Sequence, residues 1–228
     1  MDETRKYPRT LHVPFSKGLS SDDRKCEDGW FDYLKDKTLV ITEKLDGSNS
    51  YICKDGVFAR SHATTTTNPW DVNLFERGGV YDQIKNLLSE DEGIYGENLY
   101  AIHSIEYDNL DDLFYMFAAR NNDRWYSWEE VVELSKILGI KHVPVLEIRR
   151  FNSISELEST VNTIMQNGSK YGKEIEGVVI RNADSFPIDD FQKNVVKYVR
   201  ENHVQTDSHW RRNWTKAKIN YLNYGKDK

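Results

Sequence analysis

The sequence predicts an α+β fold in which antiparallel β-sheets carry flanking helices. Short β-like runs joined by turn residues dominate the first third of the chain, as in "TLVIT" and "SYICKDGVFARS". Helix signals are interspersed among later strand-like runs. Because a doubly wound parallel sheet needs strands and helices in regular alternation, this order favours hairpins with helices packed beside them.

The strand signals of the first half come in order along the chain. Residues 38–42 form an apolar run, and residues 50–61 form a hairpin pattern because Lys54-Asp55-Gly56 supplies turn chemistry. Residues 81–88 ("YDQIKNLL") predict a short helix. Residues 93–102 ("GIYGENLYAI") and 113–120 ("LFYMFAAR") predict two further strands.

Two capping-box patterns predict the helices of the second half. Ser127 and Glu130 precede "VVELSKIL", and Ser153 and Glu156 precede "LESTVNTIMQNG". Gly139 is suited to end the first of these helices. The remaining segments predict strands: 142–148 ("HVPVLEI"), 174–182 ("EIEGVVIRN") and 194–199 ("NVVKYV").

The composition is that of a globular protein. The chain has 228 residues, of which 38% are hydrophobic and 30% charged, which suits one large domain or two small ones. No run approaches the roughly eighteen apolar residues that cross a membrane, and the first residues lack the apolar segment of a secretory signal. Cys26 and Cys53 support neither a disulfide framework nor a zinc cluster. We expect a cytoplasmic protein without membrane association.

The charge is divided unevenly along the chain. The formal net charge is −6, but residues 197–228 hold eight Lys/Arg and three Asp/Glu. This tail is also rich in aromatic residues ("HWRRNWTKAKINYLNY"). Such a mixture suits contacts with phosphates and bases, and it equally suits a solvated basic helix on an acidic body. The sequence leaves both interpretations open.

Several charged residues stand within apolar, strand-like runs. Glu97 lies in "IYGENLY", Glu176 in "IEGVVI" and Lys197 in "VVKYV". Alternation predicts that Glu176 shares a face with Val178. Charges among apolar neighbours are costly unless they are paired or used. Together with Lys44 in "TEKLDGSNSY", they predict a shared polar cleft.

Six short segments, in this order, resemble the nucleotidyltransferase motifs of the covalent ligase and capping-enzyme superfamily. They are "EKLDGSN", "FARS", "YGENLY", "LFYMFAAR", "EIEGVVIRN" and "NVVKYVR". The similarity is greatest to ATP-dependent RNA ligases of the phage and bacterial, nick-sealing type. It covers about Thr42 to Arg200, and "NVVKYVRENHVQTDSHW" adds a weaker likeness to the end of this domain in one RNA ligase subgroup.

The resemblance implies a domain organisation and a reaction. Residues 1–200 would form an ATP-grasp-like nucleotidyltransferase domain, and residues 201–228 a basic aromatic tail packed on or extending it. The enzyme would join RNA ends, as a nicked duplex or an RNA–DNA hybrid for example, and act as a monomer. It would use ATP and Mg²⁺ or Mn²⁺, adenylylate itself, pass AMP to a 5′-phosphate and let a 3′-hydroxyl displace the AMP.

The first motif supplies the expected nucleophile. By resemblance Lys44 would form the lysyl-AMP, for which its pKa of about 10.4 must fall. A nearby positive charge and partial burial would lower it. Asp46 would orient Lys44 or contact the nucleotide, Gly47 would let the backbone turn past the phosphate, and Asn49 would serve phosphates or the RNA end. Glu43 would meet the adenine edge or be a solvent-facing strand end.

The later motifs supply the remaining site residues that the resemblance implies. Arg60 would hold phosphate or the RNA strand, and Glu97 would accept hydrogen bonds from the ribose. Phe117 would stack on the base, with Tyr115 as an alternative on the same strand face. Glu176 would serve the metal directly or through water. Lys197 would bind the α-phosphate and stabilise the transition state.

Two positions depart from the family pattern. A second lysine is common two residues after Lys197, where this chain has Val199. The sequence leaves open whether Arg200 or Lys193 supplies a second positive charge. Ala118 follows Phe117 where an acidic residue is frequent.

Three alternative functions remain at this point. A capping-type guanylyltransferase and a DNA ligase belong to the same superfamily, but both usually carry an OB-fold. Only about thirty residues follow Lys197, too few for a complete OB barrel. A non-catalytic nucleic-acid-binding module would explain the tail but not the charged residues in the strands.

Overall fold

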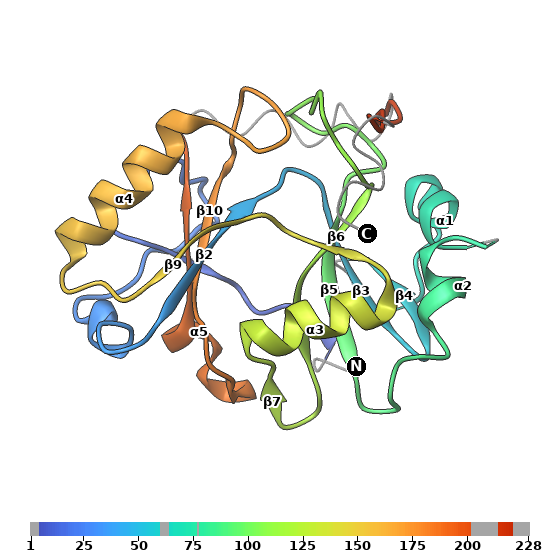
Figure 1. Ribbon diagram of the computed structural model, residues 1–228, viewed down its shortest axis with the longest axis horizontal. Coiled ribbons are helices and arrows are strands. Elements are labelled where there is room, and N and C mark those ends of the chain that lie inside the picture. The colour runs from blue at the N-terminus through green and yellow to red at the C-terminus, as the bar shows by residue number, and fades with distance from the viewer. Residues whose placement is uncertain (1–4, 60–63, 77, 202–213, 221–228) are drawn as a thin grey trace.

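The computed structural model describes residues 5–59, 64–76, 78–201 and 214–220. Its strands form two sheets that lie beside each other, with helices on their outer faces (Figure 1). The long strand pairs are antiparallel, and parallel pairing occurs at the two short strands β1 and β8. The described strands do not close into a barrel. The predicted α+β class is confirmed.

The first sheet has five strands in the order β1-β12-β10-β2-β9. Their bounds are β1 (Leu11–His12), β2 (Leu39–Lys44), β9 (Val145–Arg149), β10 (Gly177–Asn182) and β12 (Val195–Val199). Helix α4 (Ile154–Asn167) covers one face (Figure 1). Its Leu157 and Val161 are fully buried against Ile41 and Val178 of the sheet.

The second sheet is built around β5 and β6. Its order is β11-β7-β6-β5-β3-β4, and β8 pairs with β6. The bounds are β3 (Ser48–Cys53), β4 (Gly56–Phe58), β5 (Gly93–Asn98), β6 (Phe114–Arg120), β7 (Arg124–Trp125), β8 (Lys141–His142) and β11 (Phe186–Pro187). The helices on one face are α1 (Pro69–Phe75), α2 (Val80–Ile84) and α3 (Trp128–Leu138).

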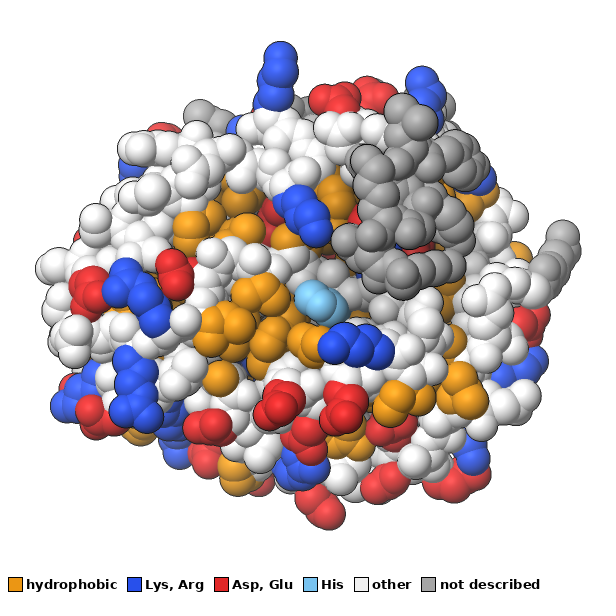
Figure 2. Space-filling model, in the orientation of Figure 1, with side chains coloured by type: hydrophobic (Ala, Val, Ile, Leu, Met, Phe, Trp, Pro, Cys, Tyr) orange, Lys and Arg blue, Asp and Glu red, His pale blue; other side chains and the backbone are white. Residues whose placement is uncertain are grey.

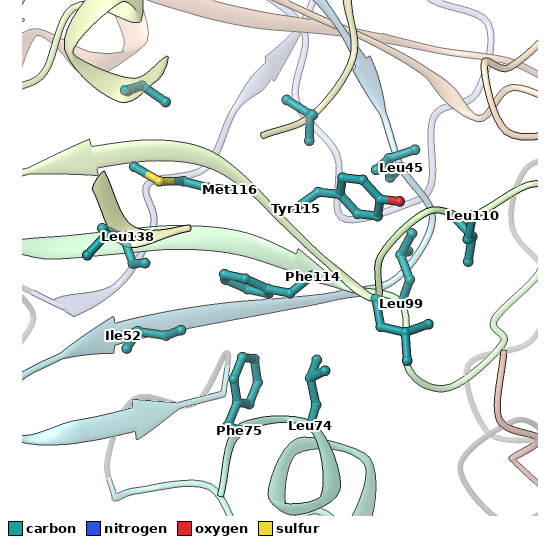
Figure 3. Close-up of a cluster of buried hydrophobic side chains, with 14 of the residues drawn as sticks. Leu45, Ile52, Leu74, Phe75, Leu99, Leu110, Phe114, Tyr115, Met116 and Leu138 are labelled. Carbon is teal, nitrogen blue, oxygen red and sulfur yellow. The ribbon is translucent and has the colours of Figure 1, made fainter. Parts of the chain in front are cut away.

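A hydrophobic core lies between that face and its helices. In Figure 3, Leu74 and Phe75 of α1 point toward the strands that carry Ile52 and Phe114. The rings of Phe75 and Phe114 meet edge to face, with centroids 5.2 Å apart. Edge-to-face packing suits two aromatic rings because the positive edge of one meets the negative face of the other. This core holds the second sheet rigidly beside the first.

The opposite face of the second sheet joins the two sheets through aromatic side chains. Tyr7, Trp125 and Phe191 lie within 5.5 Å of one another between ring centroids. Phe191 begins α5 (Phe191–Asn194), which leads directly into β12 of the first sheet. The remaining short helices are η2 (Trp30–Tyr33) and η3 (Ile188–Asp190). One face of the first sheet, at Val179 and Val195, is thereby packed against the second sheet.

The predicted helix starts are confirmed. At α3 both halves of the capping box are present, because the Ser127 hydroxyl accepts from Glu130 N and the Glu130 carboxylate accepts from Ser127 N. Gly139 ends that helix in the left-handed region, with φ of 67°. At α4 the Ser153 side chain accepts a hydrogen bond from Glu156 N.

Three sequence predictions were wrong in detail. Residues 142–148 are not one strand: the chain leaves β8 and enters β9 of the other sheet around Pro144, which has no N–H for a ladder. Helix α1 was not predicted, although Pro69 after Asn68 is a helix-start signal. Helix α2 covers only part of the expected helix, and β5 ends at Asn98.

The last described segment, residues 214–220, lies along the chain after β5. Ile102 N donates to Thr215 O, and Ala217 N donates to Tyr100 O, both at 2.9 Å. The rest of the predicted tail, residues 202–213 and 221–228, lies outside the described residues. On the face shown in Figure 2, acidic and basic side chains are interspersed around hydrophobic ones. None of the described helices has the length and apolar character needed to span a bilayer.

Candidate active site

The first motif crosses from one sheet to the other. Lys44 is the last residue of β2 in the five-stranded sheet, and Ser48 is the first residue of β3 in the seven-stranded sheet. Residues 45–47 therefore connect two sheets and are not a hairpin turn. Leu45 anchors the crossing because its side chain, 2% exposed, is buried in the core of the second sheet. Lys44 is thus held at the junction.

Gly47 allows the crossing segment to approach β5 closely. A Cβ atom at this position would lie 2.5 Å from the carbonyl oxygen of Asn98. The Gly47 N–H donates to Glu97 Oε1 at 3.1 Å. The glycine thus avoids a backbone clash with the next strand, and the turn past a phosphate stays a prediction.

Lys44, Glu176 and Glu97 are brought together between the two sheets. Lys44 Nζ donates to Glu176 Oε1 at 2.5 Å. Glu176 immediately precedes β10, where Gly177 pairs with Lys44, and Glu97 comes from β5 of the other sheet. The Glu176 side chain is 2% exposed, whereas Lys44 retains 29%. A buried carboxylate thus holds an ammonium that stays accessible.

The predicted face of Glu176 was wrong. Alternation placed it with Val178, which pairs with Glu43 and lies on the opposite face from Lys44. The strand starts only at Gly177, so alternation does not extend to Glu176. Its carboxylate is therefore free to reach Lys44.

The pKa values of Lys44 and Glu97 are both raised in this cluster. Burial alone would lower the pKa of Lys44, but Glu176, Glu97 and Asp46 outweigh burial and leave that pKa above its ordinary value. Burial, with Glu176 and Asp46 nearby, raises the pKa of Glu97 to about 8 despite the opposing charge of Lys44. The expected fall of the Lys44 pKa is not found, because this cluster contains more carboxylates than cations.

Lys197 lies in the middle of β12, on the other side of β10. Its Nζ donates to Asp23 Oδ1 at 3.1 Å. Burial and the positive charge of Lys44 lower the pKa of Lys197, although Asp23 and Glu176 oppose that change. Because the charge of Lys44 affects the pKa of Lys197, the two lysines belong to the same electrostatic site.

Glu43 and Asp46 both accept hydrogen bonds from within the protein. Glu43 is 1% exposed, and its carboxylate accepts hydrogen bonds from the Ser169 hydroxyl and from Lys170 N. Its burial excludes a solvent-facing strand end, and its contact with an adenine edge stays a prediction. Asp46 Oδ2 accepts from Ser104 N and Ile105 N, both at 2.8 Å, which ties the crossing segment to the loop after β5.

Asn49 lies beside Glu97, and Phe117 lies among aromatic side chains. Asn49 is opposite Glu97 in the β3–β5 pair, and its Oδ1 is buried without a hydrogen-bond partner among the described residues. Phe117 is half-buried and meets Tyr7 edge to face at 5.1 Å. Tyr115, the alternative stacking residue, is fully buried and donates its hydroxyl to Asp111. Arg60 lies outside the described residues.

Neither candidate for a second positive charge joins Lys197. Arg200 pairs with Glu174 at 2.7 Å, and Lys193 pairs with Asp190 at 2.7 Å on the surface. Val199 is 2% exposed at the edge of the sheet. The described residues thus place one lysine of this strand in the site.

Sequence reasoning missed Asp23 and Tyr107. Asp23 follows a polar loop and is separated from Lys197 by 174 positions. Nothing in its local sequence distinguishes it from a surface aspartate, and only the parallel β1–β12 pair brings its loop to the site. The Tyr107 hydroxyl accepts from Asp46 N at 2.9 Å, so it supports the crossing segment. The position of Tyr107 in the sequence gave no indication of this hydrogen bond.

The donor atoms are compatible with a magnesium ion. Within the described residues no group of three or more His, Cys, Asp or Glu is arranged to cage a metal. Mg²⁺ does not need such a cage, since it keeps several waters and uses one or two carboxylates together with substrate phosphates. Glu176, Glu97 and the unsatisfied Oδ1 of Asn49 provide oxygen atoms of the required kind.

Comparisons with known proteins identify a family for most of the chain. The family described as "RNA ligase" matches residues 37–199. Among curated proteins no sequence matches.

Solved ligase structures share the fold. An archaeal ATP-dependent RNA ligase has a TM-score of 0.57 at 16% identity, covering 86% of this chain and 48% of that one. A Naegleria gruberi RNA ligase mutant with ATP and Mn has a TM-score of 0.57 at 20% identity, with 86% and 58% covered. A candidate ATP-dependent DNA ligase of Aquifex aeolicus has a TM-score of 0.54 at 19% identity, with 86% and 50% covered. The chain thus spans about half the length of these ligases.

Proposed function

The chain belongs to the RNA ligase family, and from this premise we propose that it is an ATP-dependent RNA ligase with Lys44 as its nucleophile. The observation that carries the proposal is the contact of 2.5 Å between Lys44 Nζ and the buried Glu176 carboxylate at the junction of the two sheets. An accessible amine held by a buried acid is the arrangement that covalent nucleotidyl transfer needs.

In the first step Lys44 Nζ attacks the α-phosphorus of ATP. The N–P bond forms, the bond to the pyrophosphate oxygen breaks, and Lys44 must give up a proton. Glu176 Oε1 is the nearest acceptor of that proton. AMP then passes to a 5′-phosphate, and a 3′-hydroxyl displaces it to join the ends. In each step displacement at phosphorus depends on positioning and charge stabilisation.

The other residues of the site would bind and orient the nucleotide. Lys197 would hold the α-phosphate, Glu97 the ribose hydroxyls, and Phe117 the base. Glu176, with Glu97 and Asn49 nearby, would hold Mg²⁺. When bound, this ion supplies positive charge that offsets the carboxylates keeping the Lys44 pKa high.

A labelling experiment tests the chemistry. The full chain is incubated with Mg²⁺ and ATP carrying ³²P at its α-phosphate, then separated on a denaturing gel. We expect a labelled protein band that Lys44→Ala abolishes and that Lys35→Ala, a change at an exposed lysine paired with Asp32, leaves intact. An unlabelled wild-type band would contradict the proposal and favour a non-catalytic binding module.

A substrate panel tests the choice of nucleic acid. The adenylylated protein is given 5′-phosphorylated single strands, nicked duplexes and RNA–DNA hybrids, with RNA or DNA on either side of the break. We expect joining of RNA ends. Joining of DNA alone would assign the chain to DNA sealing, and label transfer from GTP would indicate a capping-type enzyme.

A further inference from the structure

Lys197 is held by a carboxylate from the N-terminal segment. Asp23 lies in the loop between β1 and η2, and its Oδ1 accepts from Lys197 Nζ at 3.1 Å. The other oxygen, Oδ2, accepts from Ser20 N at 3.0 Å and from the Ser20 hydroxyl at 2.9 Å. The loop therefore fixes the orientation of the carboxylate that meets the lysine.

His12 lies beside the same carboxylate on the inner side of the loop. The His12 side chain is 1% exposed, and its Nε2 lies 3.1 Å from Asp23 Oδ1. Its Nδ1 lies 2.8 Å from the Ser16 hydroxyl, which accepts from Val199 N at 3.0 Å. The polar contacts therefore run from β12 at Val199 through Ser16, His12 and Asp23 back to Lys197 on the same strand. Such a buried, connected network restricts the position of every member.

The contact between Asp23 and Lys197 affects the pKa values of both groups. The pKa of Lys197 is affected by Lys44 and Glu176 from inside the site and by Asp23 from the N-terminal segment. Burial and Lys44 lower its pKa, and Asp23 opposes them. Although burial would raise the pKa of Asp23, the Ser20 hydrogen bonds and Lys197 hold that pKa well below its usual range. Asp23 therefore stays anionic at neutral pH.

Apart from the residues of β12, this network is formed by residues outside the segment that the family matches. His12, Ser16 and Asp23 all precede residue 37, where the family match begins. We propose that Asp23, held by Ser20 and His12, is a positioning residue that fixes the Lys197 ammonium for the α-phosphate of ATP. This inference rests on the proposed function, because it assigns Lys197 a role in nucleotidyl transfer.

Single-turnover adenylylation at saturating ATP tests the inference. Asp23→Asn keeps the size of the side chain but removes its charge, and we expect the rate constant to fall about tenfold while the KM for ATP changes less. Asp23→Glu restores the charge and should recover part of the rate. Glu174→Gln is the matched control, because it removes an exposed carboxylate that pairs with Arg200 at the same end of the sheet.

A double-mutant cycle separates positioning from general stability. If Asp23 acts through Lys197, Asp23→Asn should slow a Lys197→Met protein no further. Additive losses, or an Asp23→Asn rate within twofold of wild type, would overturn the inference. Should Asp23→Asn fail to fold, Ser20→Ala at an exposed site removes one hydrogen bond to the carboxylate, and the rate should fall severalfold. If the wild-type protein takes up no label, the proposed function itself is wrong. If the wild-type protein is labelled and Asp23→Asn is labelled at the same rate, only this inference is wrong.

Discussion

Lys44 and Lys197 occupy the two strands that flank β10, yet their surroundings differ in charge and in origin. Lys44 faces Glu176, Glu97 and Asp46, and these carboxylates raise its pKa. Among the described residues Lys197 is paired with Asp23, and burial together with Lys44 lowers its pKa. The pKa values of two lysines in one site are therefore shifted in opposite directions.

The difference shows that the balance of neighbouring charges, more than burial, decides the state of each lysine. Burial lowers the pKa of both ammonium groups. Only the cluster around Lys44 has enough carboxylates to reverse that effect. The proposed nucleophile is therefore protonated, and the lysine proposed to bind phosphate is kept in place by one anchored acid.

The largest expected effect comes from breaking the Lys44 cluster. The Glu176 carboxylate contacts Lys44 and is also the proposed metal ligand. Glu176→Gln removes it, so adenylylation should slow by about 100-fold or more. The measurement is the rate of label incorporation with a rapid quench. The Glu174→Gln control should keep the wild-type rate. A Glu176→Gln rate within about threefold of wild type would remove Glu176 from the chemistry.

The raised pKa of Glu97 predicts a pH-dependent stability. Between the unfolded pKa of about 4.3 and the folded value of about 8, the folded state keeps a proton that the unfolded state has lost. Stability due to this group is therefore complete below about pH 4.3 and falls as pH rises toward 8, by roughly 5 kcal/mol in total.

Urea unfolding followed by tryptophan fluorescence at several pH values measures this slope. Glu97→Gln cannot lose a proton, so its stability should vary less with pH over the same range than that of wild type. Equal slopes in the two proteins would show that Glu97 titrates normally in the folded state.

Two glycines allow the surroundings of the two lysines to be disturbed separately. A Cβ at Gly47 would lie 2.5 Å from Asn98 O beside Lys44, and one at Gly18 would clash with the Arg200 carbonyl at the end of β12. Each Gly→Ala change should cost about 2 kcal/mol of stability, because backbone must move. At Gly172 an added Cβ comes no closer than 3.7 Å to its neighbours, so alanine there is the control.

Thermal melting and labelling together sharpen that comparison. We expect Gly47→Ala to slow adenylylation by displacing Lys44, and Gly18→Ala to slow it by displacing the strand that carries Lys197. If Gly18→Ala loses stability but keeps the full rate, the Lys197 side of the site tolerates movement and only the Lys44 side must be rigid.

The smallest effect is expected away from both lysines. Ser127→Ala removes the N-terminal cap of α3 and should lower stability by about 1 kcal/mol. The rate of adenylylation should stay unchanged at temperatures where the variant is folded. A loss of rate would mean that α3 influences the site through β6, against which it packs.

The accuracy of the sequence predictions followed the range of the interactions behind them. The capping boxes at Ser127 and Ser153 and the hairpin over 54–56 depend on contacts within a few residues, and the structure has them. The predicted strand over 142–148 failed because its two halves pair with different sheets. The apolar pattern is the same in either case, so it cannot indicate where a strand changes partner.

The same distinction holds for the site. Lys44, Glu97, Glu176 and Lys197 were selected because charges within apolar strands need partners, and the structure gathers them around one junction. Their partners could not be deduced: Glu43 has Ser169, and Asp46 has the backbone of the loop after β5. These pairings depend on how loops pack, which no periodicity records.

The sequence by itself determined the class of fold, the family and the identity of the charged residues, because composition, alternation and motif order are properties of the chain. Tertiary structure decided which charges meet. Lys44 meets Glu176 across 132 positions and Lys197 meets Asp23 across 174. A pKa depends on the charges within a few ångströms, and at such separations only the packing of two sheets determines which charges those are.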